Sequence, residues 1–465
     1  MKKNDRLIGI AEALGSNGEG IVRADGMTVF VPFMLPGERA QIKILQQKGK
    51  IAYGKAEEIF TPAEERVRPK CPVFFKCGGC QLQHLDYRYQ LKFKTKLVAD
   101  ALKKIGGFSC EVSPCEKSEK EYGYRNKLQL PIGRQNGRNV VGFYAERSHR
   151  IVETPQCPIH PVWSEKLIKA MYAFMEESGL NGYDESTGEG ELKRIVVREI
   201  KKKFIVTLTA AVRELSSLEL LFKKLDQIFG EYSLYLSYQP ENVNAALGDD
   251  LRLLKGPGVY EGVENEISYE AGARTFVQVN EVVRKKLYES ALALVDAEET
   301  VIDCYAGGGL LTAMFAKKCK KAYGVEIVPE ASACAESLKE KNGLSEKMEN
   351  LCGTVEEFLP KILKKEPNGV VVLDPPRAGV ERSVLEAIQA NGVQKVLYIS
   401  CNPATLARDL GILCGSLQPN ERGELIKVGT ENLDYEIQKV QPFDMFPQTR
   451  HVETLVMLSQ KNDEK

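Results

Sequence analysis

The chain has 465 residues, 43% hydrophobic and 28% charged, a composition typical of a folded protein that excludes global disorder. Its 64 basic and 64 acidic residues give a formal net charge of zero, which excludes a globally basic coat for nucleic acid but not a local basic patch. No apolar run reaches the ~18 residues that a membrane span needs, and no apolar core follows the first lysines, so we expect neither a membrane partner nor a signal peptide.

The length predicts about three domains at roughly 150 residues each. Twelve cysteines in a chain of this size are too dilute for a disulfide scaffold. They fit a reducing compartment, where cysteines serve metals or catalysis, and we therefore expect a cytoplasmic protein.

Residues 9–60 are predicted to form a small β unit. Short Val, Ile and Phe runs alternate with turns at 15–20, at Gly26 and at Pro36-Gly37, a spacing typical of a compact barrel. Residues 42–104 hold fourteen Lys or Arg against six Asp or Glu, mixed with aromatic residues. A solvated helix face explains the charge alone, whereas basic residues mixed with flat rings also suit an RNA surface.

The middle of the chain is predicted to be mixed. A Pro- and charge-rich connector opens at Thr61-Pro62, and apolar residues then recur at helical spacing from Asp86 to Ile105. Residues 121–260 alternate strand-like runs with helical stretches around 164–177 and 215–229. This pattern predicts an α+β region, and we find no catalytic motif in it.

From about Ala291 the pattern changes to apolar strands, several of them separated by stretches long enough for helices. The strands are VIDCYA, KAYGVEIV, GVVVLDPP and KVLYIS. Buried strands that alternate with helices predict a parallel, doubly wound sheet, whose ligands bind at the carboxyl ends of the strands.

The first of these strands runs into three glycines, 307–309, which let the backbone turn tightly and approach a ligand. Glu326 ends the next strand about 20 residues on, where an acid can hydrogen-bond ribose hydroxyls. The third glycine of the dinucleotide fingerprint is missing, because Leu310 and Leu311 follow. The loop therefore favours a nucleoside without phosphates, such as S-adenosylmethionine. The glycines alone are explained equally well by a tight turn that binds no ligand.

Three further motifs stand at strand ends. Two prolines follow Asp374 and would hold its carboxyl rigidly beside a cofactor, whereas a strand-ending turn needs only one. Cys401 follows KVLYIS and precedes a predicted helix whose N-terminus can stabilise a thiolate, so it is a candidate nucleophile. Taken without its neighbours, a lone cysteine is usually a small core side chain. Glu453 opens the strand LVML, where a surface carboxylate is the plainer alternative.

Together these motifs resemble the RNA uracil-5-methyltransferase family, which makes 5-methyluridine in ribosomal and transfer RNA. Residues 9–60 are similar to the TRAM barrel at the front of many members, and a cysteine set also matches. One departure is Leu310, where relatives often carry a polar residue. The matching motifs are DPPRAG at 374–379, SCNPATLARDL at 400–410, HVET at 451–454 and FVQVN at 276–280.

The resemblance implies a covalent mechanism. Uracil C5 is a poor nucleophile until a thiolate adds at C6, and we expect Cys401 to supply that thiolate. C5 then attacks the sulfonium methyl of S-adenosylmethionine. A base must remove the C5 proton before the cysteine can be eliminated, and by the resemblance that base is Glu453.

The resemblance also implies the cofactor site. Asp374 and Gln278 would hold the base or the methionine end of S-adenosylmethionine, with Tyr305 and Glu326 around the rest of it. The uridine must leave its stack to reach the cysteine and would sit flipped in a pocket. Three basic residues are candidate phosphate contacts, with a structural role as the alternative: Arg125, Lys127 and Arg134.

Four cysteines form a separate candidate site: Cys71, Cys77, Cys80 and, after 76 intervening residues, Cys157. Spacing leaves open structural zinc and a cubane iron–sulfur cluster, because both accept four thiolates. The resemblance implies [4Fe–4S] with a structural role. Cys110 and Cys115 lie nearby in the sequence and are not expected to be ligands.

We therefore expect a TRAM-like, OB-like RNA-binding β-barrel at 1–60, a central α+β iron–sulfur domain at 61–265 and a Rossmann-like methyltransferase domain at 266–465. The segment 86–118 can pack with the last of these instead of with its neighbours in the chain. The expected substrate is RNA, with 23S rRNA favoured by the resemblance and tRNA as the alternative, and the expected enzyme is a monomer.

Two other functions compete with this one. Asp-Pro-Pro also suits amino- or cytosine-methyltransferases, but that class has no use for both Cys401 and Glu453. A non-catalytic RNA-binding iron–sulfur protein with a vestigial cofactor fold is the alternative from another class. The intact glycine loop beside the cysteine and glutamate argues against it.

Overall fold

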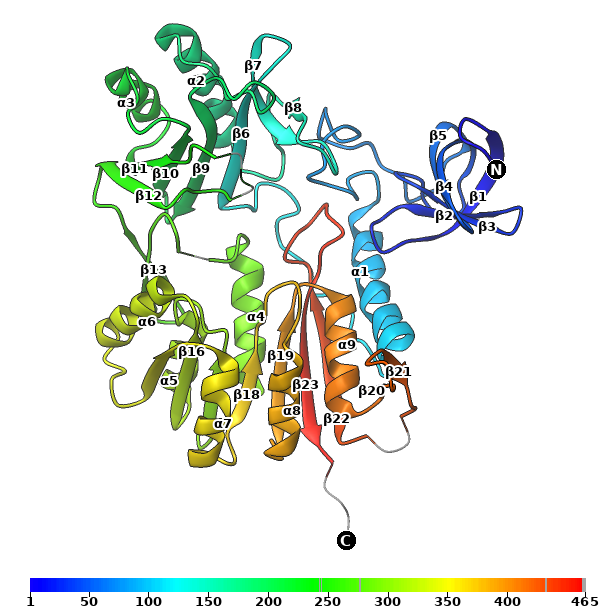
Figure 1. The fold of residues 1–465 in the computed structure, drawn as a ribbon, viewed down its shortest axis with the longest axis vertical. Coiled ribbons are helices and arrows are strands. Elements are labelled where there is room, and N and C mark those ends of the chain that lie inside the picture. The colour runs from blue at the N-terminus through cyan, green and yellow to red at the C-terminus, as the bar shows by residue number, and fades with distance from the viewer. Residues whose placement is uncertain (242, 244, 276, 431–432, 462–465) are drawn as a thin grey trace.

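Figure 1 shows a computed structural model of the chain, which describes residues 1–241, 243, 245–275, 277–430 and 433–461. Phe276 of the FVQVN match lies outside the described residues. In these ranges no helix has both the length and the apolar character that crossing a membrane requires.

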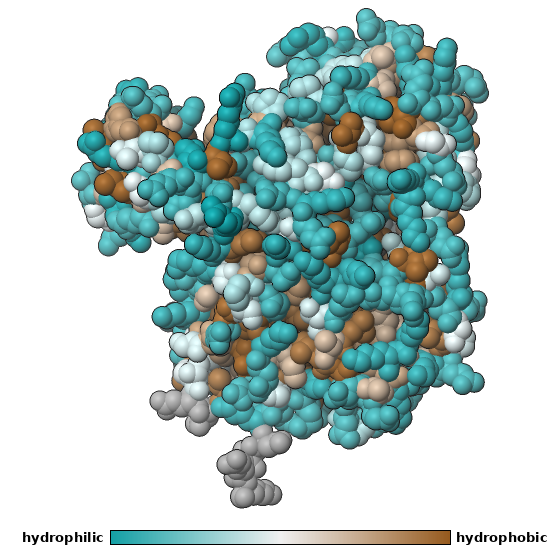
Figure 2. Space-filling model, turned by 180° about the vertical axis from the view of Figure 1, so that it is seen from behind, coloured by the Kyte–Doolittle hydropathy of each residue, from teal (hydrophilic) through white to brown (hydrophobic). Residues whose placement is uncertain are grey.

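The N-terminal strands close into a barrel, as the glycine-turn spacing predicts. Its strand order is β1-β2-β3-β5-β4, and Val22, Val29 and Ile42 are fully buried inside it. Figure 2 shows the barrel as a lobe that projects from the body, with hydrophobic side chains on its surface. The strands are β1 (Arg6–Leu14), β2 (Gly20–Ala24), β3 (Met27–Val31), β4 (Arg39–Lys48) and β5 (Ile51–Thr61).

The helix expected after the connector is α1 (Tyr87–Ala101), which continues as a π-helical turn η1 (Leu102–Gly106). Asp86 caps its N-terminus by accepting a hydrogen bond from the Arg88 N–H at 3.0 Å. Val98 and Leu102 are buried in the same hydrophobic core as the C-terminal sheet. Figure 1 shows α1 running between the barrel, its neighbour in sequence, and the distant helix α9.

The central region forms one mixed sheet in the order β12-β11-β10-β9-β6-β7-β8, with α2 (Trp163–Ser178) and α3 (Leu218–Asp226) packed on it. The two helices lie where the sequence places them. The strands are β6 (Lys127–Gln135), β7 (Arg138–Tyr144), β8 (Ile151–Glu153), β9 (Leu192–Ile200), β10 (Lys203–Ala210), β11 (Glu231–Tyr238) and β12 (Asp250–Lys255).

The C-terminal sheet has the order β17-β16-β15-β18-β19-β23-β22. The four predicted strands pair in parallel, but β23 runs antiparallel to both β19 and β22. The sequence analysis missed β17, because this edge strand is short and half polar. The strands are β15 (Thr300–Cys304), β16 (Lys321–Glu326), β17 (Met348–Cys352), β18 (Val370–Leu373), β19 (Lys395–Ser400), β22 (Tyr435–Phe443) and β23 (Glu453–Gln460).

Helices cover both faces of this sheet, as in a doubly wound fold. One core packs α7, α8, α9 and α1 on the strands, and the other packs α4, α5 and α6. The hairpin of β13 (Tyr260–Glu264) and β14 (Ile267–Ala271) also joins the second core, and so spans the expected boundary at 265. A second hairpin joins β20 (Leu417–Pro419) and β21 (Leu425–Lys427). The helices are α4 (Glu281–Ala293), α5 (Leu310–Lys318), α6 (Pro329–Lys341), α7 (Val355–Lys365), α8 (Arg382–Ala390) and α9 (Pro403–Cys414).

Candidate active site

The candidate nucleophile and base meet because of the direction of β23. Cys401 directly follows the parallel strand β19, and Glu453 is the first residue of its antiparallel neighbour β23. Ser400 lies opposite Thr454 in the register of these two strands. The start of β23 therefore lies at the same sheet edge as the end of β19. Both side chains, with Asp374 from the end of β18, line one pocket of about 660 Å³.

Cys401 sits in a tight turn that leads into α9. Asn402 caps this helix by accepting a hydrogen bond from the Ala404 N–H at 3.1 Å, and its amide donates to the Arg377 carbonyl at 3.1 Å. Burial raises the pKa of the Cys401 thiol, the charge of Glu453 raises it further, and the guanidinium of Arg377 opposes both. Arg377 is thus the positive group that favours the thiolate, a role that the sequence analysis did not assign.

Glu453 is only 3% exposed. Burial raises its pKa well above the usual range, the neighbouring Asp374 carboxylate adds to the effect, and Arg377 opposes it. Burial also raises the pKa of Asp374 to about 7. A carboxylate with a raised pKa is a stronger proton acceptor, which is what removing a carbon-bound proton near neutral pH requires.

A second cavity, of about 320 Å³, lies at the glycine loop. It is lined by Gln278, Tyr305 and Leu310, among others. Glu326 holds the loop from the end of β16: its carboxylate accepts hydrogen bonds from the Gly307 and Val328 N–H groups, each at 2.8 Å. Glu326 is not among the residues lining this cavity, so its observed contacts in the described structure are with backbone.

The two cavities share a wall. Gln278, Tyr305 and Asp374 line both the glycine-loop cavity and the pocket of Cys401 and Glu453. A group bound at the glycine loop would therefore lie against side chains that also face the pocket of the nucleophile. Such an arrangement suits the transfer of a small group from one bound molecule to another.

The sequence analysis also missed two buried acids. Asp303 accepts a hydrogen bond from the Thr312 hydroxyl at 2.5 Å and lines the glycine-loop cavity, and burial raises its pKa to about 7. The sequence feature that could have revealed Asp303 is an acidic residue inside the apolar strand VIDCYA. Asp409 of α9 accepts hydrogen bonds from the Tyr398 hydroxyl at 2.6 Å and the Val380 N–H at 2.8 Å, and so ties the loop after Asp374 to the helix after Cys401.

The four candidate cysteine ligands converge on another wall of the Cys401 pocket. Three of them, Cys71, Cys80 and Cys157, pack with Phe74, Tyr124 and Ile159. Burial raises the pKa of the Cys157 thiol, and the charges of the three other thiols add to it. Cys110 and Cys115 lie elsewhere, in the core beneath α1. The four cysteines are Cys71, Cys77, Cys80 and Cys157.

Among the described residues, no group of three or more His, Cys, Asp or Glu side chains is arranged to hold a metal ion. The four thiols nevertheless line one pocket, and the other three lie near enough to Cys157 for their charges to raise its pKa. Four thiolates are the donor set both of a structural zinc ion and of a cubane iron–sulfur cluster.

The structure separates the three candidate phosphate contacts. Arg125 and Lys127 line the Cys401 pocket, and burial, with the charges of two nearby arginines, lowers the pKa of Lys127 to about 8. Arg134 lies in a different cavity beside Tyr183 and Lys193. Its position at the far end of β6 takes it away from the pocket.

Comparisons with known proteins give the family of the chain. A family model described as tRNA (Uracil-5-)-methyltransferase matches residues 261–461, and a TRAM domain model matches residues 11–56. An RNA methyltransferase of Clostridium tetani is 36% identical over 471 residues, covering 100% of this chain and 98% of its own. One of Halalkalibacterium halodurans is 35% identical, covering 99% and 98%. The chain belongs to the RNA (uracil-5-)-methyltransferase family.

A crystal structure with a similar fold supports the assignment of this methyltransferase to the family. The crystal structure of Pyrococcus abyssi tRNA (uracil-54, C5)-methyltransferase in complex with S-adenosyl-L-homocysteine superposes with a TM-score of 0.75 at 26% identity, covering 97% of this chain and 100% of that one. The expected resemblance, the methyltransferase fold and the TRAM barrel are thus confirmed.

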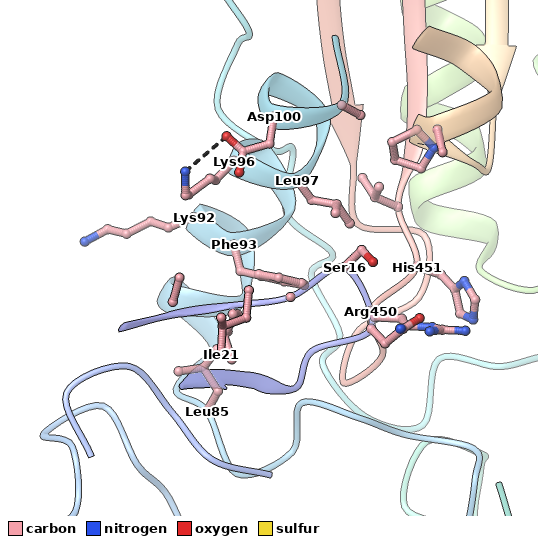
Figure 3. Close-up of a pocket in the computed structure, with 18 of the residues that line it drawn as sticks. Ser16, Ile21, Leu85, Lys92, Phe93, Lys96, Leu97, Asp100, Arg450 and His451 are labelled. Atoms are coloured by element: carbon pink, nitrogen blue, oxygen red, sulfur yellow. Dashed lines mark hydrogen bonds and ion pairs between the residues drawn. The ribbon is translucent and has the colours of Figure 1, made fainter. Parts of the chain in front are cut away.

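A groove of about 860 Å³ leads to Cys401 of the methyltransferase from the side of the barrel. Figure 3 shows Ser16 and Ile21 of the barrel on one side and α1 on the other, with Arg450 and His451 at the inner end. On α1, Lys92 lies 4.4 Å from the ring centre of Tyr89. Basic and aromatic side chains along a groove are typical of surfaces that bind single-stranded nucleic acid.

Proposed function

We propose that the protein methylates C5 of a uridine in RNA with Cys401 as the nucleophile and Glu453 as the base. One observation carries the proposal. The two side chains line a single pocket, and Gln278, Tyr305 and Asp374 connect that pocket to the glycine-loop cavity. Methyl transfer to an exocyclic nitrogen needs no such pair, because the amine attacks the methyl group directly, so the arrangement favours a ring carbon such as C5 of uracil.

The reaction follows from the chemistry of the two residues. The Cys401 thiolate, favoured by Arg377, adds to C6 of the flipped uracil and makes C5 nucleophilic. S-adenosylmethionine, when bound at the glycine loop, supplies the sulfonium methyl that C5 takes up. Glu453 then accepts the C5 proton, the bond between Sγ and C6 breaks, and 5-methyluridine leaves.

The cofactor site is proposed by the same argument. Gln278 and Asp374 would hold one end of S-adenosylmethionine, since both line the shared wall, and Tyr305 would pack beside it. Glu326 would accept hydrogen bonds from the ribose hydroxyls while its carboxylate still accepts from the Gly307 N–H of the glycine loop. Leu310 lines the cavity at the first turn of α5 and can offer only apolar contact there.

We favour 23S rRNA as the substrate, on the combination of a TRAM barrel and four clustered cysteines. Transfer RNA is the second candidate, because the superposed Pyrococcus abyssi enzyme is a tRNA methyltransferase. Mapping 5-methyluridine in total RNA with and without the gene tests the activity and separates the two substrates. Loss of the nucleotide from 23S rRNA alone is the expected result, and loss from tRNA alone would replace the first choice by the second.

Complementing the deleted strain with Cys401→Ala tests the nucleophile. Alanine removes the thiol without adding an unpaired polar group, so the variant should fold and bind S-adenosyl-homocysteine normally. It should restore no 5-methyluridine. Restoration to the level given by the wild-type gene would exclude Cys401 as the nucleophile.

We also propose that Cys71, Cys77, Cys80 and Cys157 hold a structural [4Fe–4S] cluster. The proposal rests on the family resemblance and on four thiols that line one pocket. Cys157 is distant in sequence from the other three, so the cluster would close a long loop and order the chain between them. Protein purified anaerobically should be brown with about four iron atoms per chain. Stoichiometric zinc in a colourless, active sample would contradict the assignment.

The division into parts at 1–60, 61–265 and 266–465 is likewise a proposal. The barrel, the central sheet and the C-terminal sheet support it, with 86–118 assigned to the last part because α1 packs there. The described chain supplies both cavities and both reacting side chains, so we propose a working monomer. The free thiols support a reducing, cytoplasmic setting.

A further inference from the structure

The segment 444–452 joins β22 to β23 and leads directly into Glu453. Two polar side chains of α1, Gln90 and Lys94, are buried against it, with exposed fractions of 1% and 0%. They lie one helical turn apart and therefore share a face of the helix. Burying an amide and an ammonium group on one face is costly unless both find partners, so their contacts are informative.

Gln90 binds Gln448 through both ends of its amide. Its Nε2 donates to Gln448 Oε1 at 3.0 Å, and its Oε1 accepts from the Gln448 N–H at 3.1 Å. The same Nε2 also donates to the Leu85 carbonyl at 2.8 Å, which fixes its orientation. Gln448 has a φ of +70°, a conformation that a side chain other than glycine adopts only under constraint.

Lys94 holds the beginning of the same segment. Its ammonium donates to the Asp444 carboxylate and to the Phe446 carbonyl, the second at 3.0 Å. Both members of the ion pair have fully buried side chains. A buried ion pair is weak evidence for stability alone, because its desolvation offsets much of the attraction. Its directional bonds do, however, fix the position of the segment.

The third support comes from the cysteine loop. The Gln448 carbonyl accepts hydrogen bonds from the N–H groups of Gln81 at 3.2 Å and Leu82 at 3.0 Å, two residues that directly follow Cys80. The segment is thus held by side chains of α1 and by backbone beside the cysteines. Five positions separate Gln448 from Glu453, too few to absorb a shift of the segment without moving the carboxylate.

We infer that Gln90 and Lys94 are positioning residues for Glu453, which hold 444–452 so that the carboxylate meets the C5 proton. The inference rests on the proposed role of Glu453 as the base. Neither Gln90 nor Lys94 lines the glycine-loop cavity or the Cys401 pocket. Phe446 of the segment lines the Cys401 pocket, whereas no residue of 444–452 lines the glycine-loop cavity. Loss of the two side chains should therefore spare cofactor binding and slow the step that the base performs more than the steps before it.

The test measures the covalent protein–RNA intermediate in Gln90→Ala, with Glu453→Gln as the reference. RNA and methyl-labelled S-adenosylmethionine are mixed with each protein, and the labelled adduct is followed on a denaturing gel. In Gln90→Ala we expect the adduct to form at nearly the wild-type rate and to break down about tenfold to a hundredfold more slowly, the effect of a small misplacement. A merely structural role would instead reduce formation and breakdown together with the folded fraction.

Arg88→Ala is the matched control, because Arg88 lies on the same helix with 82% of its side chain exposed. It should give wild-type kinetics. Should Gln90→Ala fail to fold, Gln448→Gly replaces it: glycine adopts a φ of +70° freely, and it removes the amide while loosening the segment. The same slow breakdown is expected for this variant.

The outcomes separate the two ideas. If Glu453→Gln traps the adduct and neither folded variant slows its breakdown, the positioning role is overturned while the base assignment stands. If Glu453→Gln traps no adduct, the base assignment falls first and the positioning role falls with it. Slow adduct breakdown in Glu453→Gln and in the folded positioning variant, Gln90→Ala or its replacement Gln448→Gly, supports both the base role and the positioning role.

Discussion

Replacing Glu453 by glutamine should stall the enzyme after methyl transfer. The amide has nearly the same shape as the carboxylate, so the pocket should stay intact, but it cannot accept the C5 proton. The product therefore remains bound to Cys401, and a labelled covalent adduct accumulates.

The size of the effect follows from the burial of this residue. A positioned base contributes about 10²- to 10⁴-fold to a proton transfer, or roughly 3 to 5.5 kcal/mol at about 1.36 kcal/mol per tenfold. Glu453 is only 3% exposed, so bulk water cannot easily replace it. We therefore expect the upper half of that range, with adduct breakdown slowed by about 10³-fold or more.

The assay is a denaturing gel of protein, RNA and methyl-labelled S-adenosylmethionine, with the rate of adduct decay measured after a chase. Glu436→Gln is the control, since it removes an exposed carboxylate from the neighbouring strand β22. Decay within tenfold of the wild-type rate in Glu453→Gln would refute the argument. Loss of activity with no adduct, while S-adenosyl-homocysteine still binds, would show that Glu453 acts before methyl transfer.

Two further predictions concern the buried acids. The pKa of Asp303 is raised from 3.8 to about 7, so the folded state retains a proton that the unfolded state loses. The contribution of Asp303 to the free energy of unfolding should therefore fall as pH rises from about 4 to about 7, by at most about 1.4 kcal/mol per unit. Asp303→Asn should flatten that slope in urea titrations at several pH values, and an unchanged slope would contradict the assignment. Asp409→Ala leaves the Tyr398 hydroxyl and the Val380 N–H without their acceptor and should lower the free energy of unfolding by about 3 kcal/mol. A loss under 1 kcal/mol in the same urea assay would show that other acceptors replace the Asp409 carboxylate.

The local elements were the part that the sequence could predict. Glycine turns between short apolar runs are a local signal, and they predicted the barrel at 9–60. Apolar strands followed by Gly, Asp-Pro-Pro and Cys-Asn-Pro predicted β15, β18 and β19 and placed Asp374 and Cys401 at their ends. Each of these signals lies within a few residues, which is why periodicity could reveal it.

Long-range arrangement could not be predicted in this way. An apolar run such as LVML indicates a strand but not its direction, and only the antiparallel course of β23 brings Glu453 to Cys401. The charge of Arg377 beside the thiol and the buried pair of Lys94 with Asp444 likewise depend on sheet order. Arg134 is close to Arg125 in the sequence but not in the structure. The sequence suggested a shared role for the two arginines, but Arg134 lies at the end of β6 that points away from the Cys401 pocket.

The contacts between α1 and 444–452 also constrain how the chain folds. Gln90 and Gln448 are 358 positions apart, and Lys94 and Asp444 are 350 apart. Until the last strands are synthesised, the Lys94 ammonium lacks Asp444 and Phe446, and the Gln90 amide has only local carbonyls such as that of Leu85. Burying that face of α1 earlier would therefore carry a large desolvation cost. Contacts of such long sequence separation form late, because the entropy of closing the intervening chain is lost before the contact can stabilise the fold. Docking of α1 is therefore expected to be a final folding step, one that assembles the base only in a nearly complete chain.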